Sequence, residues 1–232
     1  MAKSKIILDL ANSSVDTMTA LKRAKVLLLE LGNDKLLEWV NCEIAGYPSD
    51  AEVPEYRVVQ GNLMGSYIKG SMANHMKWNN VSLPLGKMPD EIRDRILNVS
   101  FHEGVDALKK LLESTDDEER QLGATLPAEF FPIIAKCNND PYMNIISARV
   151  VIGSQFAQNI FSVIENKLLD IFMILEKEFG NLDSLDIDVS GKSEEELHKI
   201  SERMVVFIYN DNRVNVGNGN KIKDSNIASS IE

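Results

Sequence analysis

The stretch LLEWVNCEIAGYPSDAEVPEYRVV, residues Leu36–Val59, decides how the N-terminal part of the chain folds. Apolar residues recur at helical spacing in its first half, and the run stops at Gly46, which can take the left-handed conformation that ends helices. Pro48 and Pro54 follow, and proline cannot continue a helix and favours extended geometry in the residue before it. We therefore interpret this punctuation as the joint between a helix and a strand that begins at YRVV, rather than as a binding site.

The residues before this stretch predict a second helix that packs against the first. Ser-Ser-Val-Asp at positions 13–16 is a helix start, and the apolar residues from Leu21 to Leu31 form a wide buried face. Gly32-Asn33 ends this helix and starts the next one. Because the joint is so short, the pair is expected to form an antiparallel helical hairpin.

The middle of the chain alternates strand and helix signals. Glycines interrupt the β-type run 56–70, which predicts hairpins or bulges there. The acidic segment Thr115–Arg120 is expected to be an exposed loop. The remaining predicted elements are a short strand at 81–85, helices at 90–97, 103–114 and 126–137, and a strand at 144–152.

The longest helix is predicted at Ser154–Phe179, with apolar residues at helical spacing and Gly180 after its end. Its polar face, which includes Glu165, Lys167 and Asp170, is mostly acidic, so a packed core or a dimer seam is favoured over contact with anionic lipid. Ser193–Glu196 is a capping box that opens a last helix, which is expected to run into a strand at Val205–Tyr209.

These elements predict an α+β fold. It consists of a helical hairpin at the N-terminus, a small antiparallel sheet, a long amphipathic C-terminal helix and a short Asn/Gly-rich β-type tail. The expected organisation is one α+β domain over 1–180, a linker with a capped helix and strand over 181–209, and the tail over 210–232.

Composition and charge narrow the function classes. The 232 residues are 44% hydrophobic and 26% charged, which is typical of a globular protein, and the net charge is −10. A field of that sign repels phosphate backbones, which disfavours nucleic-acid binding as the role. Cys42 and Cys137 have no recognisable spacing and no apolar run is long enough for a leader or a membrane span, so we expect a cytoplasmic protein with no membrane contact.

No residue pattern predicts an enzyme. His75, His102 and His198 lie in separate segments without metal-ligand spacing, and Cys42 falls between apolar positions of a helix, where a buried thiol is the simplest interpretation. Phosphate-binding glycine loops are missing from the sequence. We therefore expect no catalytic residue, no cofactor and no metal.

Two acidic groups give weaker signals. Asp183, Asp186 and Asp188 have a spacing that could bind a divalent cation, but they lack the glycine turn and distal glutamate of a calcium loop, so a solvated linker is favoured. Glu38 and Glu43 are five residues apart, and a helix turns such a pair away from each other.

The tail is chemically unusual because asparagine and glycine alternate with isolated valine and isoleucine. It has too few apolar groups for a core of its own, which leaves a disordered end or ordered self-association through asparagine ladders. Its short core resembles the self-templating motifs of bacterial death-signalling proteins, with Arg213, Lys221 and Lys223 opposing uncontrolled stacking. The predicted self-association residues are Val214, Asn215, Val216, Gly217, Asn218, Asn220, Ile222, Asn226 and Ile227.

Most of the chain resembles the AbiTii domain family, from about Ile6 to Phe179. The resemblance is carried by ALKRAKVLLLELGNDKLLEWVNCEIAGYP, PEYRVV, LPLGKMPDEIR and SVIENKLLDIFMILEKEF. It implies a role in bacterial abortive infection against phage, without a catalytic motif. Its most specific residues are Trp39, Glu43, Gly46, Tyr47, Pro48, Pro54, Glu55, Tyr56 and Arg57.

Two functions are compatible with this resemblance. The first is a non-enzymatic adaptor or regulator that binds itself and another defence-system protein. The second is an effector enzyme, a nuclease or nucleotide hydrolase, with an acidic site at Glu38, Glu43 and Arg57 that could hold a metal. A structural role is also open for these residues, because a buried Arg57 paired with Glu43 or Glu38 would tie the helical hairpin to the sheet.

Overall fold

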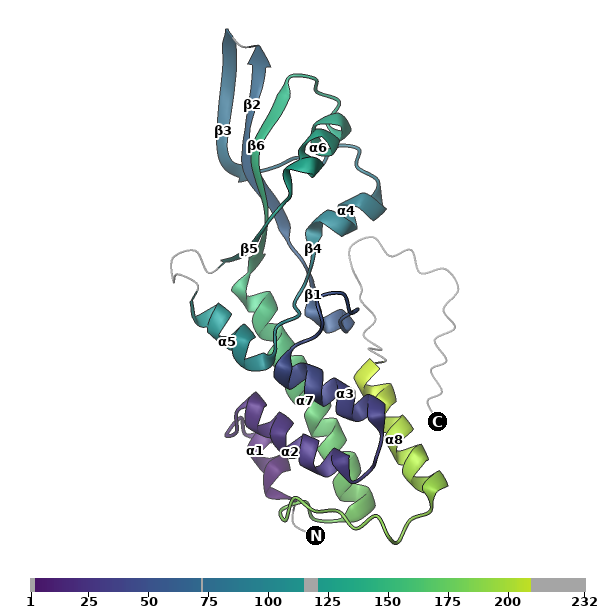
Figure 1. Ribbon diagram of the computed structural model, residues 1–232. Helices are drawn as coiled ribbons and strands as arrows, with labels where there is room; N and C mark the ends of the chain where they lie inside the picture. Colours follow the sequence, from purple (N-terminus) through teal and green to yellow (C-terminus); the bar gives the residue numbers. More distant parts are fainter. Residues whose placement is uncertain (1–2, 72, 115–120, 210–232) are drawn as a thin grey trace, which may run out of the picture.

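A 26-residue helix, α7 (Ser154–Phe179), forms the axis of one half of the molecule. The computed structural model describes residues 3–71, 73–114 and 121–209 of the chain (Figure 1). Helices α1, α2, α5 and α8 pack on α7, and α3 packs on α2. The bounds of these helices are α1 (Lys5–Ala11), α2 (Thr17–Leu29), α3 (Asp34–Ala45), α5 (Val105–Glu113) and α8 (Glu194–Tyr209).

Amphipathic helices account for the core of this half. Leu28 of α2, Trp39 of α3 and Leu168 of α7 are at most 1% exposed and belong to one continuous apolar cluster. Each helix contributes its apolar stripe because burying that surface is the main source of stability. Asp16 and Asn33 cap α2 and α3 by accepting from the backbone N–H three residues on, and the two helices pack against each other, which confirms the predicted helical hairpin.

The other half is an antiparallel sheet with strand order β3-β2-β6-β5. Helices α4 and α6 cover one face of the sheet (Figure 1). Leu63, Ile134 and Ile145 belong to a second apolar cluster, which lies between these helices and the sheet. The register shifts between Gly65 and Tyr67, which confirms a predicted bulge. The bounds are β2 (Asn62–Ser71), β3 (Asn74–Ser82), α4 (Asp90–Leu97), β5 (Gln121–Thr125), η2 (Ala128–Phe130), α6 (Phe131–Cys137) and β6 (Met143–Gly153).

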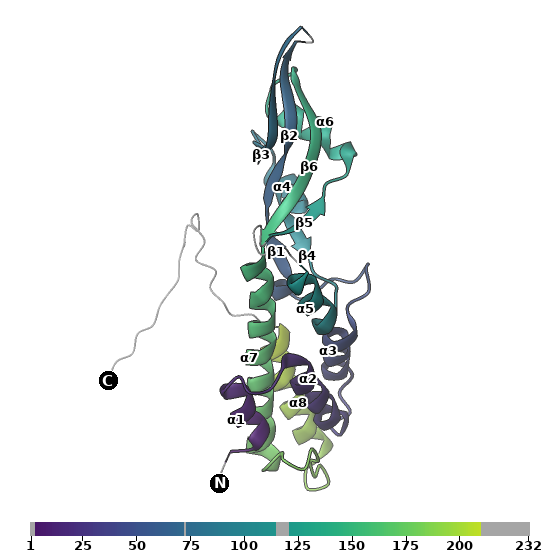
Figure 2. The ribbon, with the colours of Figure 1, turned by 90° about the vertical axis from the view of Figure 1, so that its left-hand side faces the viewer.

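A narrow waist joins the two halves, so the molecule is elongated (Figure 2). Strand β6 runs directly into α7, and the short ribbon of β1 (Val58–Gln60) and β4 (Asn98–Ser100) crosses the same level. The ribbon follows the 3-10 turn η1 (Glu55–Arg57), which lies beside α7.

Several sequence predictions need correction. Val205–Tyr209 is not a strand but the last part of α8, because Met204 and Ile208 lie four residues apart on the face that packs against α7. Tyr56 and Arg57 are in η1, so the strand begins only at Val58. The strand expected at 81–85 is the end of β3, which stops at Ser82.

The other predicted elements are confirmed, except that the helix expected at 126–137 is the 3-10 turn η2 followed by α6, which begins only at Phe131. The confirmed elements include the capping box, in which Ser193 Oγ donates to Glu196 and accepts from its N–H. The segment Thr115–Arg120 and the tail 210–232 lie outside the described residues, and the proposed domain boundary at residue 180 stays a prediction. Within the described ranges, no helix combines the length and apolar character needed to cross a membrane.

Candidate functional site

The end of α3 and the turn η1 bring the family-motif residues together. Trp39 and Glu43 are four residues apart on α3, so both side chains point to the same side, toward η1. Gly46 ends the helix with φ 102° and ψ 159°; the positive φ was expected, whereas the ψ is not that of a left-handed helix. A Cβ there would lie 2.9 Å from the His102 carbonyl oxygen, so the close approach of the 102–104 backbone also requires glycine.

The centre of the site is an ion pair between Glu43 and Arg57, whose side chains are 0% exposed. Arg57 Nη2 lies 2.5 Å from Glu43 Oε2, and Arg57 Nε lies 3.2 Å from Glu43 Oε1. The remaining bonds run from Arg57 Nη1 to the carbonyls of Phe101 and Glu103, at 3.0 and 2.8 Å. Of the two partners predicted for Arg57, the structure selects Glu43, and the pair ties α3 to the waist.

Two tyrosines and a tryptophan complete the arrangement. The hydroxyls of Tyr47 and Tyr56 donate to Glu43 Oε1 at 2.7 and 2.6 Å. Trp39 Nε1 donates to the Tyr56 hydroxyl at 2.8 Å. We call these five residues, Trp39, Glu43, Tyr47, Tyr56 and Arg57, the Glu43 cluster.

The protonation states in the Glu43 cluster follow from burial and charge. Burial raises the pKa of both tyrosine hydroxyls, and the Glu43 carboxylate raises it further, so both remain neutral donors. Burial acts to lower the pKa of Arg57, but the hydrogen bonds and charge of Glu43 outweigh it and the pKa lies above its ordinary value. The charges of Glu43 and Arg57 offset each other, and the two tyrosines stay protonated as donors.

A lysine that the sequence analysis assigned to the polar face of α7 extends this unit. Lys167 is 6% exposed, and its Nζ lies 5.3 Å from the centre of the Tyr56 ring. The same Nζ donates to the carbonyls of Phe207 and Ile208 at 3.0 Å each. Lys167 therefore holds the last turn of α8 beside the Glu43 cluster. Its position four residues after Val163 and four before Ile171 could have revealed its place on the buried face.

The structure does not assemble the acidic site that was considered on α3. Glu38 is exposed, whereas Glu43 is buried and bonded to Tyr47, Tyr56 and Arg57, so the two carboxylates do not converge. Cys42 is half-buried beside them, and burial raises the pKa of its thiol.

The remaining motif residues have backbone roles or face solvent. The carbonyl of Pro54 accepts from the N–H of Arg57, and that of Pro48 lies 2.9 Å from His102 Nδ1, while Glu55 is exposed. The predicted self-association residues 214–227 lie outside the described part of the chain.

The aspartates between α7 and α8 act in local structure. Asp183 accepts from the N–H of Lys5, and Asp188 accepts from the N–H and hydroxyl of Ser190. Over residues 3–71, 73–114 and 121–209, no three His, Cys, Asp or Glu side chains gather in a way that could hold a metal ion.

Fold and site together define a two-lobed α+β domain in which a buried ionic cluster locks a helical hairpin to a sheet. The chain belongs to the AbiTii family, whose family model matches residues 4–200 and so reaches into α8. The family name places the protein in abortive infection, a defence of bacteria against phage. No functionally curated protein and no solved structure matches the chain.

Proposed function

We propose that this protein is a non-enzymatic adaptor or regulatory component of an abortive-infection system in the cytoplasm. It would act through contacts with itself and with another defence-system protein, and residues 210–232 would supply the homotypic contacts. The observation that supports this proposal is the complete enclosure of the Glu43–Arg57 pair. Five of the nine motif residues bind one another in the Glu43 cluster, which leaves recognition to the surface of the domain.

The alternative, an effector enzyme with an acidic site on α3, is disfavoured by the same contacts. A metal or a phosphate ester would have to reach Glu43, whose two oxygens already accept from Arg57 and the tyrosines. Removing Glu43 from these donors would leave Arg57 buried without a counter-charge, which costs several kcal/mol, about 3–5.

Solution mass tests the assembly part of the proposal. Sedimentation of the full-length chain beside a chain that ends at Asn210 is expected to show a larger species only for the full-length chain. The truncation leaves α8 complete, because that helix ends at Tyr209. Equal masses, together with unchanged phage protection by the truncated chain, would contradict the proposal.

A second measurement separates adaptor from effector. Glu38 is the exposed carboxylate of the acidic group, so Glu38→Gln leaves the buried pair intact. The adaptor proposal expects full phage protection from this variant. Lost protection at an unchanged solution mass would favour the effector.

A further inference from the structure

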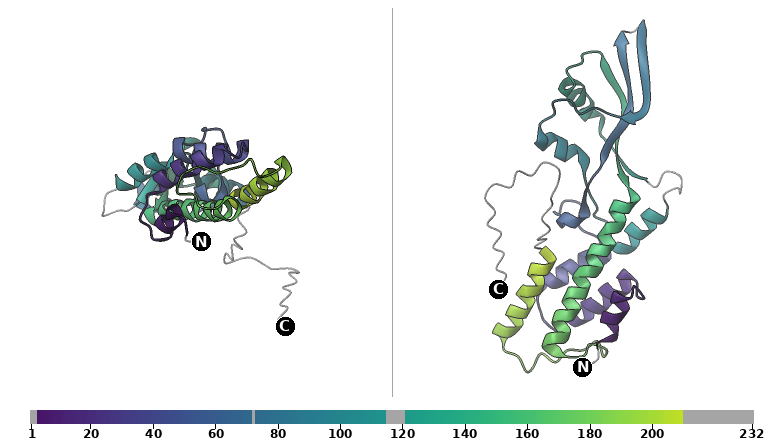
Figure 3. Two further views of the ribbon diagram at one scale, coloured as in Figure 1. Left: turned by 90° about the horizontal axis from the view of Figure 1, so that it is seen from below. Right: turned by 180° about the vertical axis from the view of Figure 1, so that it is seen from behind.

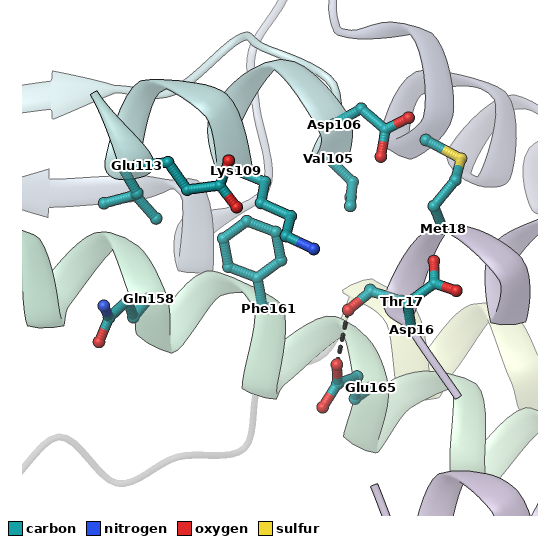
Figure 4. A pocket seen from close by; sticks show the side chains of 11 residues that line it. Asp16, Thr17, Met18, Val105, Asp106, Lys109, Glu113, Gln158, Phe161 and Glu165 are labelled. Carbon is teal, nitrogen blue, oxygen red and sulfur yellow. Dashed lines mark hydrogen bonds between the residues drawn. The ribbon is translucent and has the colours of Figure 1, made fainter. Parts of the chain in front are cut away.

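A cleft of about 440 Å³ lies among the start of α2, helix α5 and the first half of α7 (Figure 4). Helices α2 and α5, which line it, lie on the opposite side of α7 from α8, as the view from behind shows (Figure 3). Its apolar surface comes from Met18, Val105 and Phe161, whose ring faces the space between the helices. The Glu43 cluster does not contribute to this cleft.

The polar side chains of the cleft are predominantly acidic. Asp16, Asp106, Glu113 and Glu165 stand against one cation, Lys109, which gives four negative charges and one positive charge, a net −3. Asp16 caps α2 through Thr19, and one oxygen of Glu165 accepts from Thr17.

Asp106 and Glu113 have carboxylates that no side chain or backbone group in the described part of the chain binds. Both residues are exposed. Together with Lys109 they lie on one face of α5, at spacings of three and four residues. Two exposed carboxylates of a cleft that is also lined by the Phe161 ring are thus available to a ligand.

This combination selects an amphipathic cation. An aliphatic stem can cover Phe161 while its charged end reaches a carboxylate, and a cation near an aromatic face gains further attraction. Phosphate-bearing ligands are repelled by the negative excess. The basic side chains of a protein segment, spaced by small or aliphatic residues, fit both properties.

The chain itself carries such a segment beyond α8. Arg213, Lys221 and Lys223 give three positive charges over residues 213–223, a span without acidic residues that Asp211 and Asp224 border, and this local excess is opposite in sign to the −3 of the cleft. Lys221 and Lys223 flank Ile222, so cationic ends and an aliphatic group occur together. The segment starts after α8, which ends at Tyr209 and lies across α7 from α2 and α5, and the twelve residues to Lys221 can span up to about 40 Å.

We propose that Lys221-Ile222-Lys223 of one copy docks in the acidic cleft of a second copy. This inference rests on the proposed function and names the surface that the homotypic contact uses. The contact is head-to-tail, because the segment and the cleft are different surfaces, so it can be repeated from copy to copy.

Charge reversal in the full-length chain tests the docking. The cleft variant is Asp106→Lys with Glu113→Lys, and the segment variant is Lys221→Glu with Lys223→Glu. Sedimentation is expected to show self-association weakened by at least about tenfold in each, and restored when the two are combined, since close charge pairs couple by this much or more. Association of the natural chain is expected to weaken with added salt.

A matched control makes the same change of charge elsewhere. Asp50 and Glu52 are exposed in the connection between α3 and η1, and Asp50→Lys with Glu52→Lys should leave the mass unchanged. Because Asp106 lies in the first turn of α5, where a carboxylate favours the helix, the neutral pair Asp106→Asn with Glu113→Gln is a second cleft variant. It is expected to weaken association by a smaller factor.

The outcomes separate this inference from the proposed function. If the mass depends on residues 210–232 but not on either cleft variant, the docking site is wrong and the assembling segment stands. If full-length protein is a monomer at every concentration, docking in a second copy is overturned. If full-length and truncated chains have equal masses, homotypic assembly fails and the docking fails with it.

Discussion

Glu43 of α3 and Arg57 of η1 form a bidentate ion pair with both side chains fully buried, at 2.5 and 3.2 Å. The pair closes the connection between the helical hairpin and the waist. Burying two charges is costly, and their attraction offsets that cost only when the geometry is good and the remaining donors are bonded. Both conditions hold, since Arg57 also donates to the carbonyls of Phe101 and Glu103.

Breaking this pair is expected to be severe. Arg57→Ala leaves the Glu43 carboxylate buried without its counter-charge, so the free energy of unfolding should fall by about 3–5 kcal/mol. Urea unfolding followed by circular dichroism measures the loss. Lys199→Ala is the control, because its pair with Glu195 is 69% and 78% exposed and is worth less than about 1 kcal/mol. Similar losses in both variants would show that the buried pair has no special weight.

The Tyr56 hydroxyl is expected to contribute to the free energy of unfolding through its two hydrogen bonds. Tyr56→Phe removes a donor to Glu43 and the acceptor of Trp39 Nε1, and unpaired buried polar groups cost about 1–3 kcal/mol. The same unfolding titration applies. In Tyr142→Phe, which alters a side chain 64% exposed, the change should stay within about 0.5 kcal/mol. A Tyr56 variant as stable as the natural chain would argue against a structural hydroxyl.

The sequence predicted most helices and strands, and it failed where tertiary contacts override local preference. Val205–Tyr209 is rich in β-branched and aromatic residues, which favour strands. It is helical because Met204 and Ile208 pack inward and Lys167 binds the carbonyls at the helix end. The residues Val205–Tyr209 do not by themselves reveal the contact with Lys167, because that lysine is about forty positions away in the chain.

Among the elements that were not predicted, α1 and β5 depend on distant partners for their stability. Helix α1 has seven residues and no side-chain cap, too short to be stable alone, and it is held by Glu176 and Asp183. Strand β5, QLGAT, has weak strand preference and pairs with β6 along its length. In the site, Gly46 and Pro54 predicted the connection between helix and strand, but the Glu43–Arg57 pairing could be predicted only with the family resemblance.

Substitution of Lys167 is expected to destabilise the end of α8 locally. Lys167→Met keeps most of the apolar stem and removes the donor to Phe207 and Ile208, so the last turn of α8 should fray. Hydrogen exchange at Ile208 and Tyr209 is expected to be about tenfold faster, equivalent to about 1.4 kcal/mol. Lys177 is an exposed residue of α7, the helix that also carries Lys167, and Lys177→Met should leave the exchange rates of these amides unchanged. Unchanged exchange in Lys167→Met would mean that packing alone holds the helix end.

At the other end of the helical half, the contribution of Glu176 to stability is expected to depend on pH. Its carboxylate accepts from the N–H and hydroxyl of Ser4, at 2.6 and 2.7 Å, and from Lys3 Nζ, at 2.5 Å, which joins α1 to α7. Burial raises the pKa of Glu176, but these hydrogen bonds outweigh it and lower the pKa from 4.5 to about 2.

Because the folded-state pKa lies below the unfolded value, the unfolded chain takes up the proton first when the pH falls. The stabilisation by Glu176 is therefore complete above the unfolded pKa of 4.5 and is lost as the pH falls through about 2. Unfolding midpoints in urea are expected to show Glu176→Gln less stable than the natural chain near neutral pH, with the gap narrowing as the pH falls below 4.5. Glu91→Gln, at an exposed position of α4, should run parallel to the natural chain. A gap for Glu176→Gln that stays constant down to the lowest pH at which the protein folds would show that the lost group acts by packing rather than by its charge.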